Sequence, residues 1–358
     1  MTAPNTATLA RPPVAAQPIA ASTEVGALGV VHLKRLWSRA LAPRRDDTPE
    51  TAVREWRALH VLFSGLELGL EETLRHLGAT RPSFAAFEDW VLARNGGALD
   101  PRAVARINAA LSGQAPPPDA QAAIDAVDAM PPVLGPDDLA HWHEHGWVVL
   151  PDAIPPDACR ASAQAIWQAL DMDPGDPATW TRRRPLQQCV FVQLFRHPAL
   201  DANRRSRRIH KAFAQLWGTA DLWTTTDRVG FNPPEHVQGP FPGPFIHWDV
   251  SLSRPIPLGV QGLIYLTDTA ADQGAFALVP GMHRTIDAWL DALPPGADPR
   301  EAAMRDLEMT PIAGQAGDLI LWHHALPHGP TPNRTDQPRL VHYVKMFPAD
   351  FGYDPVWL

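Results

Sequence analysis

The sequence predicts an α+β fold in which a small helical unit precedes a larger, strand-containing body. A chain of 358 residues exceeds a typical single domain, which favours two units. Between residues 25 and 113, leucines recur at three- and four-residue intervals, the period of an amphipathic helix. Beyond residue 136, short apolar segments such as 259–266 lie between glycine- and proline-rich turns, as strands do.

The N-terminal third divides into three segments. Residues 1–24 are rich in Ala, Pro and Thr and are predicted to be disordered. Residues 25–113 form the helical unit, with a leucine stripe from Leu59 to Leu77 that Gly78 is expected to stop, a helix over 83–93 capped by Ser83, and a third helix from Asp100 to Ser112. Residues 114–135 are a Pro/Ala-rich connector with a short helix over 120–130, and residues 136–358 form the body. The leucine stripe is expected to pack on the body or on a partner subunit, so a homodimer through this unit and a lid are both open.

The body begins with a helix over 136–145 that ends at Gly146, followed by a first strand. A second helix is expected over 154–170 and a strand over 187–194. His141 and His145 have the i, i+4 spacing of a zinc site, but a solvated helix face is the favoured interpretation.

Two imidazoles and one carboxylate are the central feature of the body. His247 and Asp249 flank Trp248, and on an extended strand residues i and i+2 point to the same face. His328, far along the chain, is expected to join them from a neighbouring strand. Two histidines and one carboxylate with open positions form the facial triad of non-heme Fe(II) oxygenases.

Arg339 follows His328 after ten residues dense in turn formers. His328 is expected to end one strand, and Arg339 to start the next, over 339–347. A guanidinium beside a metal can fork onto the carboxylate of a bidentate keto acid.

These motifs together resemble the phytanoyl-CoA dioxygenase family. The resemblance runs from about residue 136 to residue 346 and is carried by His247-x-Asp249, by residues 278–283, 317–322 and 328–333, and by Arg339. The family comprises Fe(II)- and 2-oxoglutarate-dependent oxygenases. The resemblance therefore implies a double-stranded β-helix (a jelly-roll, cupin-like barrel) with flanking helices.

The resemblance also implies roles for individual residues. His247, Asp249 and His328 match the iron ligands, and Arg339 matches the 2-oxoglutarate anchor. Many members carry a small hydroxyl residue two positions after the second histidine, where this chain has Pro330. Thr331 follows, so that contact is lost or rebuilt. In the family a second cosubstrate contact often comes from the next strand, here 259–266, where Tyr265 or Gln261 is expected either to supply it or to pack in the barrel wall.

The implied cofactors are Fe(II), 2-oxoglutarate and O2. Halogenating relatives replace the carboxylate ligand by a small residue, so Asp249 favours hydroxylation. The expected reaction hydroxylates an aliphatic C–H of a small or medium acyl or natural-product substrate, with release of succinate and CO2. One alternative is a cupin-like isomerase or dioxygenase without a keto acid, against which Arg339 argues. Another is a non-catalytic binding protein on the same barrel, against which the intact triad argues.

Four residues are candidate substrate contacts: Trp180 and Arg182 in one loop, Phe245 just before the triad, and His324 just before His328. The basic runs 182–184 and 204–208 are interpreted as solvated faces, or as contacts to an anionic substrate group.

Composition excludes several partners. A net charge of −8 argues against nonspecific nucleic-acid binding. No apolar run approaches the roughly 18 residues of a membrane span, and no secretory signal is apparent. Two cysteines, Cys159 and Cys189, form no disulfide framework and suggest a reducing cytoplasm. The expected partner is a small-molecule substrate.

Overall fold

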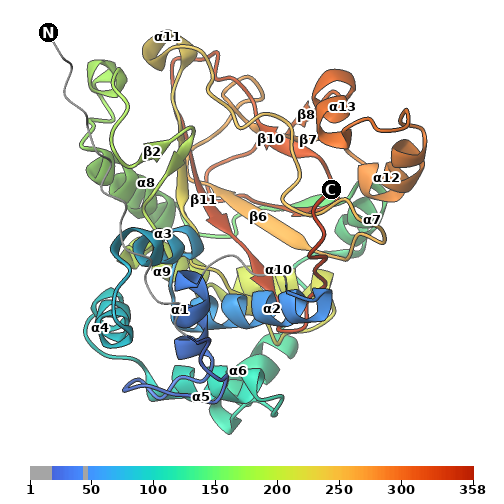
Figure 1. Ribbon diagram of the computed structural model, residues 1–358. Helices are drawn as coiled ribbons and strands as arrows, with labels where there is room; N and C mark the ends of the chain where they lie inside the picture. The colour runs from blue at the N-terminus through green and yellow to red at the C-terminus, as the bar shows by residue number, and fades with distance from the viewer. Residues whose placement is uncertain (1–17, 43–46) are drawn as a thin grey trace, which may run out of the picture.

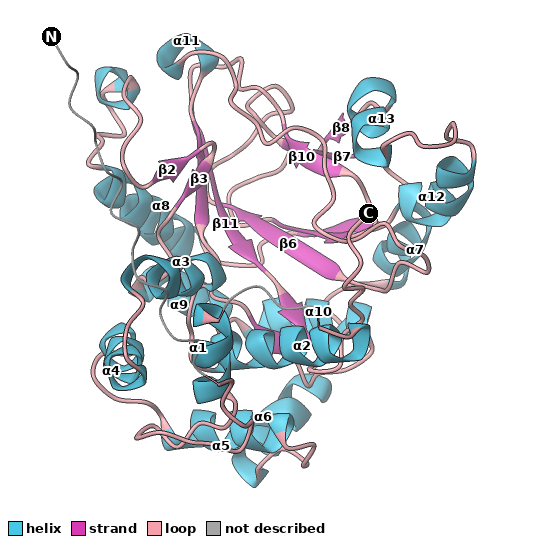
Figure 2. Ribbon diagram, viewed as in Figure 1, coloured by secondary structure: helices cyan, strands magenta, loops and turns pink. Residues whose placement is uncertain are grey.

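The computed structural model describes residues 18–42 and 47–358, and shows helices packed around antiparallel sheets (Figures 1 and 2). The helices are α1 (Leu33–Leu41), α2 (Pro49–Gly65), α3 (Leu70–Thr80), α4 (Phe84–Arg94), α5 (Pro101–Leu111), α6 (Pro118–Asp128), α7 (Pro136–His145), α8 (Pro156–Leu170), the 3-10 turn η1 (Pro177–Trp180), α9 (Pro198–Arg204), α10 (Arg207–Trp217), α11 (Glu235–Gln238), α12 (Met282–Asp291) and α13 (Pro299–Asp306). The strands are β1 (Trp147–Leu150), β2 (Gln187–Gln188), β3 (Phe191–Val192), β4 (Trp223–Thr224), β5 (Val229–Asn232), β6 (Val260–Tyr265), β7 (Phe276–Leu278), β8 (Thr310–Pro311), β9 (Leu319–His323), β10 (His328–Pro330), β11 (Arg339–Val344) and β12 (Met346–Phe347).

The main sheet has seven strands in the order β1-β9-β6-β11-β5-β3-β2, and its pairs are antiparallel. A three-stranded sheet, β10-β7-β8, packs against it, and β12 pairs with β4. Side chains alternate between two cores because successive strand residues point to opposite faces. In β11, Leu340 packs into the core that contains residues of α8 and α10, whereas Val341 packs into the core between the two sheets.

The helices of residues 33–111 surround a third core, into which the leucine stripe packs. Leu62, Leu66 and Leu77 are almost fully buried there, and the same core contains Trp223 of β4 and Phe347 of β12. The stripe thus packs on the body. Figure 1 shows α2 crossing beside the lower ends of the central strands.

The leucine stripe belongs to two helices, so the expected single helix ending at Gly78 was wrong. Helix α2 ends at Gly65, and the backbone turns through Glu67, which has a φ of 49°. A Cβ at Gly65 would lie 2.4 Å from Ile107 of α5, so only glycine allows this close approach. Helix α3 runs past Gly78 to Thr80, and Arg81 after it adopts the left-handed conformation.

Other helix ends are as expected. Ser83 and Asp100 accept hydrogen bonds from the backbone N–H groups of Ala86 and Arg102, at 3.2 and 2.9 Å, and so cap α4 and α5. Gly146, with a φ of 79°, ends α7.

Three strand expectations were wrong. Residues 187–194 form the short hairpin of β2 and β3, because Cys189 adopts a φ of 55° and turns the chain. The strand over 339–347 is interrupted at Lys345. His328 begins β10 and Arg339 begins β11, but the two strands lie in different sheets.

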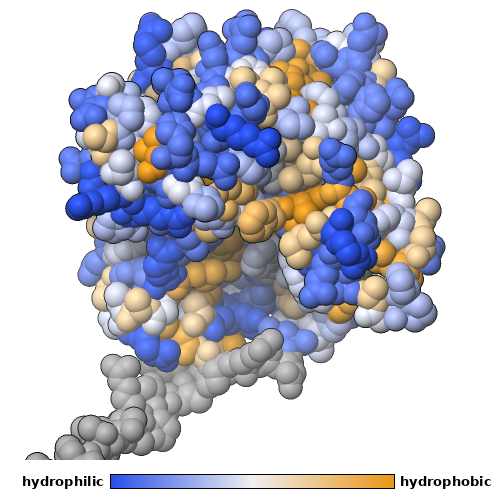
Figure 3. Space-filling model, turned by 90° about the horizontal axis from the view of Figure 1, so that it is seen from above, coloured by the Kyte–Doolittle hydropathy of each residue, from blue (hydrophilic) through white to orange (hydrophobic). Residues whose placement is uncertain are grey.

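Two expectations concern the N-terminal residues and membrane spans. The disorder expected for residues 1–24 falls mostly outside them, although the N–H of Ala20 donates to Ser38 Oγ at 3.0 Å. Among the helices described, none has the length and apolar character needed to cross a membrane. Figure 3 shows a hollow in one face of the molecule, with hydrophobic side chains gathered beside it.

Candidate metal and cosubstrate site

His247, Asp249 and His328 come together at one point, as expected. Their ligand atoms all lie within 4.8 Å of one another, and they are the single group of this kind among the described residues. Nε2 of His247 lies 3.6 Å from Asp249 Oδ1, and Nε2 of His328 lies 3.5 Å from Asp249 Oδ2. Three donors of this kind on one side of a gap can hold a divalent ion and leave its other side open.

Both imidazoles are oriented by backbone carbonyls. Nδ1 of His247 lies 2.7 Å from the carbonyl of Phe245, and Nδ1 of His328 lies 2.9 Å from that of Leu326. In each ring Nδ1 therefore carries the proton that the carbonyl accepts, which leaves the lone pair of Nε2 facing the gap. Burial lowers the pKa of His247, which favours the neutral form that binds metals.

Asp249 is ionised and aimed by a neighbouring amide. Burial alone would raise its pKa, but the two histidines beside it and the hydrogen bond from the Gln261 amide lower it well below its usual range. Gln261 donates from Nε2 to Asp249 Oδ2 at 2.7 Å. Gln261, expected to contact a cosubstrate, thus holds the carboxylate in place.

The local backbone differs from the expected strand. His247 forms an isolated bridge with His328, whose N–H donates to the carbonyl of His247 at 3.0 Å, and Asp249 lies in a bend just after it. Arg300 of α13 stabilises this bend by donating to the carbonyls of Trp248 and Val250, at 2.9 and 2.8 Å. No sequence signal identified Arg300, because its contact spans about fifty residues.

Arg339 is fully buried, with 0% of its surface exposed. None of its three guanidinium nitrogens has a hydrogen bond of normal geometry to the described residues, although the Tyr343 hydroxyl lies beside the guanidinium. Along β11, alternation places Arg339 on the same face as Val341 and Tyr343, the face toward the space between the sheets. A buried guanidinium without such bonds is costly, so this arrangement fits a carboxylate ligand.

Tyr343 and Lys345 were missed from the sequence. Both line a cavity of about 110 Å³ that also contacts His247, Asp249 and His328. Burial raises the pKa of Tyr343, and the charge of Arg339 opposes that rise. The alternation Arg339, Tyr343, Lys345 at even spacing could have identified them, because it repeats the period of a strand.

The other expected cosubstrate contacts are already engaged within the protein. The Tyr265 hydroxyl donates to the carbonyl of Ile312 at 2.7 Å and accepts from the N–H of Phe276 at 3.0 Å. Thr331 Oγ1 donates to the carbonyl of Ala275 at 3.1 Å. Neither hydroxyl proton is free for a ligand in this arrangement.

Of the candidate substrate contacts, Phe245 lies beside the triad. It is 58% exposed, and its carbonyl holds the His247 ring. Trp180 as a substrate wall was wrong, since it is 1% exposed and stacks on Trp167 in the core. The ring of His324 is turned to the carbonyl of Pro257, and Arg182 is exposed on its loop.

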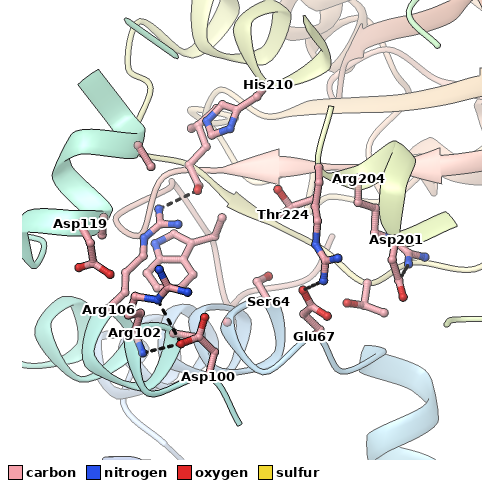
Figure 4. A pocket seen from close by; sticks show the side chains of 18 residues that line it. Ser64, Glu67, Asp100, Arg102, Arg106, Asp119, Asp201, Arg204, His210 and Thr224 are labelled. Carbon is pink, nitrogen blue, oxygen red and sulfur yellow. Dashed lines mark hydrogen bonds and ion pairs between the residues drawn. The ribbon is translucent and has the colours of Figure 1, made fainter. Parts of the chain in front are cut away.

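A second, larger cavity of about 480 Å³ lies where α5 and α6 face α9 and α10, and Figure 4 shows it. Its charged side chains largely pair with each other. Arg102 pairs with Asp100 at 3.4 Å, and Arg204 pairs with Asp201 at 2.8 Å. It therefore offers no cluster of donors like the triad.

Known proteins match this chain over the segment that carries the site. The family model described as phytanoyl-CoA dioxygenase (PhyH) matches residues 142–341, which include the triad and Arg339. A Dictyostelium discoideum protein, whose name assigns it to the same family, is 20% identical over 265 residues, which are 58% of this chain and 74% of that protein.

Solved structures with similar folds also match part of this chain. The non-heme alpha ketoglutarate dependent carbocyclase SnoK from nogalamycin biosynthesis is 20% identical, with a TM-score of 0.45, over 64% of this chain and 88% of that one. HygX from Streptomyces hygroscopicus, solved with nickel and 2-oxoglutarate, is 16% identical, with a TM-score of 0.43, over 61% of this chain and 88% of that one. Similarities of this size carry no argument about substrate.

Proposed function

Because the chain belongs to the phytanoyl-CoA dioxygenase family, we propose that it is an Fe(II)- and 2-oxoglutarate-dependent oxygenase that hydroxylates an aliphatic C–H bond of a small or medium organic molecule. The observation that carries the proposal is the buried guanidinium of Arg339, which has no hydrogen bond of normal geometry to the described residues and lies on the interior face that the triad shares.

The donor set fits the two cofactors. His247, Asp249 and His328 would hold Fe(II), and Arg339 would bind the far carboxylate of 2-oxoglutarate with paired, charge-assisted hydrogen bonds. Many family members hold the cosubstrate with a hydroxyl at the position of Pro330, and Tyr343 supplies that hydroxyl here. Tyr343 lines the cavity that contacts the triad, and it lies on the same strand face as Arg339. When bound, these cofactors supply the oxidation of the substrate by O2, with 2-oxoglutarate converted to succinate and CO2.

The protein positions the metal ligands and restricts water at the site. Gln261 and Arg300 hold the carboxylate ligand and its backbone, which keeps the donor geometry before the metal arrives. Trp322 and Phe276 pack against the ring of His328, with centroids 5.2 and 5.7 Å away, and restrict water on that side. The carboxylate of Asp249 occupies the position that would otherwise admit chloride, which supports hydroxylation over halogenation.

The two packed sheets support the double-stranded β-helix as the scaffold. The His247 segment adds to the edge of the three-stranded sheet through its bridge to β10, opposite β6, β9 and β11 of the main sheet. The triad and Arg339 thus come from both sheets of the sandwich.

An anaerobic titration tests the proposal. Apoprotein is titrated with Fe(II) and then with 2-oxoglutarate, and the weak visible charge-transfer band of the chelate is followed. We expect a band that disappears in His247→Ala and weakens in Arg339→Ala.

Matched surface variants serve as controls. His236 and Arg254 are exposed, and each pairs with a surface acid, so His236→Ala and Arg254→Ala should keep the full band. Bound iron without a band in the wild-type protein would refute the use of 2-oxoglutarate and favour the cupin-like alternative.

A further inference from the structure

The helices outside the family match border the proposed iron site. A cavity of about 260 Å³ lies between α2 and the body, and Asp249 and Gln261 form part of its wall. The same two residues, with Lys345, also line the smaller cavity at the triad. The two cavities therefore meet at the carboxylate that would bind iron, and about half of the Asp249 side chain is open to them.

One face of α2 lines this cavity. Trp56, Leu59, His60 and Phe63 all border it, at positions i, i+3, i+4 and i+7, which share one side of a helix. The other side of α2 is packed in the core through Val61 and Leu62. Phe63 also belongs to that core, and Trp56 and His60 contact aromatic residues near the C-terminus, so this face both packs in the protein and forms an apolar wall of the cavity.

The ammonium of one cation of the cavity, Lys345, has no hydrogen bond or ion pair with any described residue. Burial lowers the pKa of this ammonium, and the nearby charges of Asp249 and Asp227 oppose that shift. The other cation, Arg228, is held by Glu71 at 2.6 Å. Once a metal neutralises Asp249, Lys345 is left without a nearby partner of opposite charge.

The acids and histidine around Lys345 do not take its place. Asp227 accepts the N–H of Arg228 at 2.8 Å, and burial raises its pKa, which disfavours its charged form. His60 stays neutral because burial and the charge of Lys345 lower its pKa to about 3. His60 and Lys345 both line the cavity.

We infer that α2 and the start of α3 form the wall of the substrate chamber, and that this chamber takes a small molecule with a hydrophobic body and one anionic group, which Lys345 binds. The inference rests on the proposed function, since the chamber is placed by its contact with Asp249. The volume lies just below the usual range of ligand sites, so the substrate is compact. At its far end the chamber meets the polar cavity of Figure 4, with which it shares Ser64 and Thr226.

Three probes of equal length test the head group. Octanoate, octan-1-ol and octylamine are titrated calorimetrically into the anaerobic protein loaded with Fe(II) and 2-oxoglutarate. We expect octanoate to bind at least about tenfold more tightly than either other probe, or about 1.4 kcal/mol. Lys345→Met should remove this preference and leave octan-1-ol binding unchanged. The same change at the surface, Lys34→Met, should alter neither.

A second variant tests the wall. Leu70 begins α3 and lines the chamber, whereas Leu74, one turn later, is 39% exposed and does not. Leu70→Trp should fill the chamber and weaken octanoate and octan-1-ol alike by at least about tenfold, and Leu74→Trp should have no effect. Leu70→Phe, a smaller change, repeats the test if the indole disturbs folding.

Each contrary result is decisive. Equal or tighter binding of octylamine, or no effect of Lys345→Met, overturns the anionic group, and unchanged affinities in Leu70→Trp and Leu70→Phe overturn the chamber. Failure of the wild type to bind any probe overturns both. Probe titrations are repeated on metal-free protein to separate this inference from the proposed function. If octanoate binds but Fe(II) and 2-oxoglutarate give no charge-transfer band, the chamber is supported and the proposed function is overturned. If the band forms but no probe binds, the proposed function is supported and the chamber is overturned.

Discussion

Replacing Arg339 by methionine should stabilise the apoprotein and abolish its response to 2-oxoglutarate. The guanidinium is 0% exposed and has no hydrogen bond of normal geometry to the described residues. Replacing buried ionic groups by apolar ones of similar size often stabilises a protein by about 1–4 kcal/mol. We expect a gain of about 2 kcal/mol, near the middle of that range.

The gain converts into a measurable shift in Tm. With an unfolding entropy of about 2.1 cal/mol/K per residue, this 358-residue chain has about 0.75 kcal/mol/K in total. The Tm of Arg339→Met should therefore rise by about 3 °C. At 100 times its Kd, 2-oxoglutarate should stabilise the metal-loaded wild type by about 2.7 kcal/mol, or about 4 °C. The variant should lose this second shift.

Differential scanning calorimetry with and without 2-oxoglutarate measures both shifts, with a redox-inert divalent ion in the site. Arg254→Met is the matched control, because its exposed pair with Asp291 contributes little to stability. A lower Tm for apo Arg339→Met, together with an undiminished 2-oxoglutarate shift, would refute the reasoning. The guanidinium would then be a structural group satisfied by the fold.

Three further outcomes are expected. Gln261→Leu removes the amide that holds Asp249 at 2.7 Å and should weaken divalent-metal binding about 10- to 100-fold by anaerobic calorimetry, whereas Gln168→Leu on the exposed side of α8 should not. Acid should destabilise the fold through His60: its folded pKa of about 3 lies below the unfolded value of about 6.5, so its contribution is intact above pH 6.5 and is lost as pH falls toward 3, by about 1.4 kcal/mol at pH 5.5. His60→Asn should flatten the dependence of urea unfolding on pH, and an unchanged slope would contradict the burial of a neutral ring. Chelation of the metal should abolish the 2-oxoglutarate band, and added Fe(II) should restore it; a band that survives chelation would place the keto acid elsewhere.

Local sequence signals predicted the helix ends well. Ser83, Asp100 and Gly146 act within a few residues of themselves, through a side-chain cap or a left-handed backbone, so no distant contact is needed to identify them. The break between α2 and α3 was missed because the leucine spacing continues across it. Gly65 lies against Ile107, and periodicity alone does not record that contact.

The site likewise contains residues that local sequence signals predicted and features that they did not. The residue types at His247, Asp249, His328 and Arg339 were legible because their chemistry and order along the chain are distinctive. The strand geometry assigned to them was less accurate, since Asp249 lies in a bend that Arg300 holds from another helix. Trp180 was misplaced because an aromatic residue in a loop has no sequence signal that separates a core position from a cavity wall.

The sequence by itself determined the donor set and the helical and strand periods, because each depends on residue chemistry or on spacing within one element. Only the tertiary structure decided which side chains meet those donors. Gln261 contacts Asp249. The triad cavity is lined by Tyr343 and Lys345, and the adjoining cavity by α2, through contacts between segments up to several hundred residues apart. Such contacts follow from how sheets and helices pack against one another, and the linear order of residues does not encode them locally.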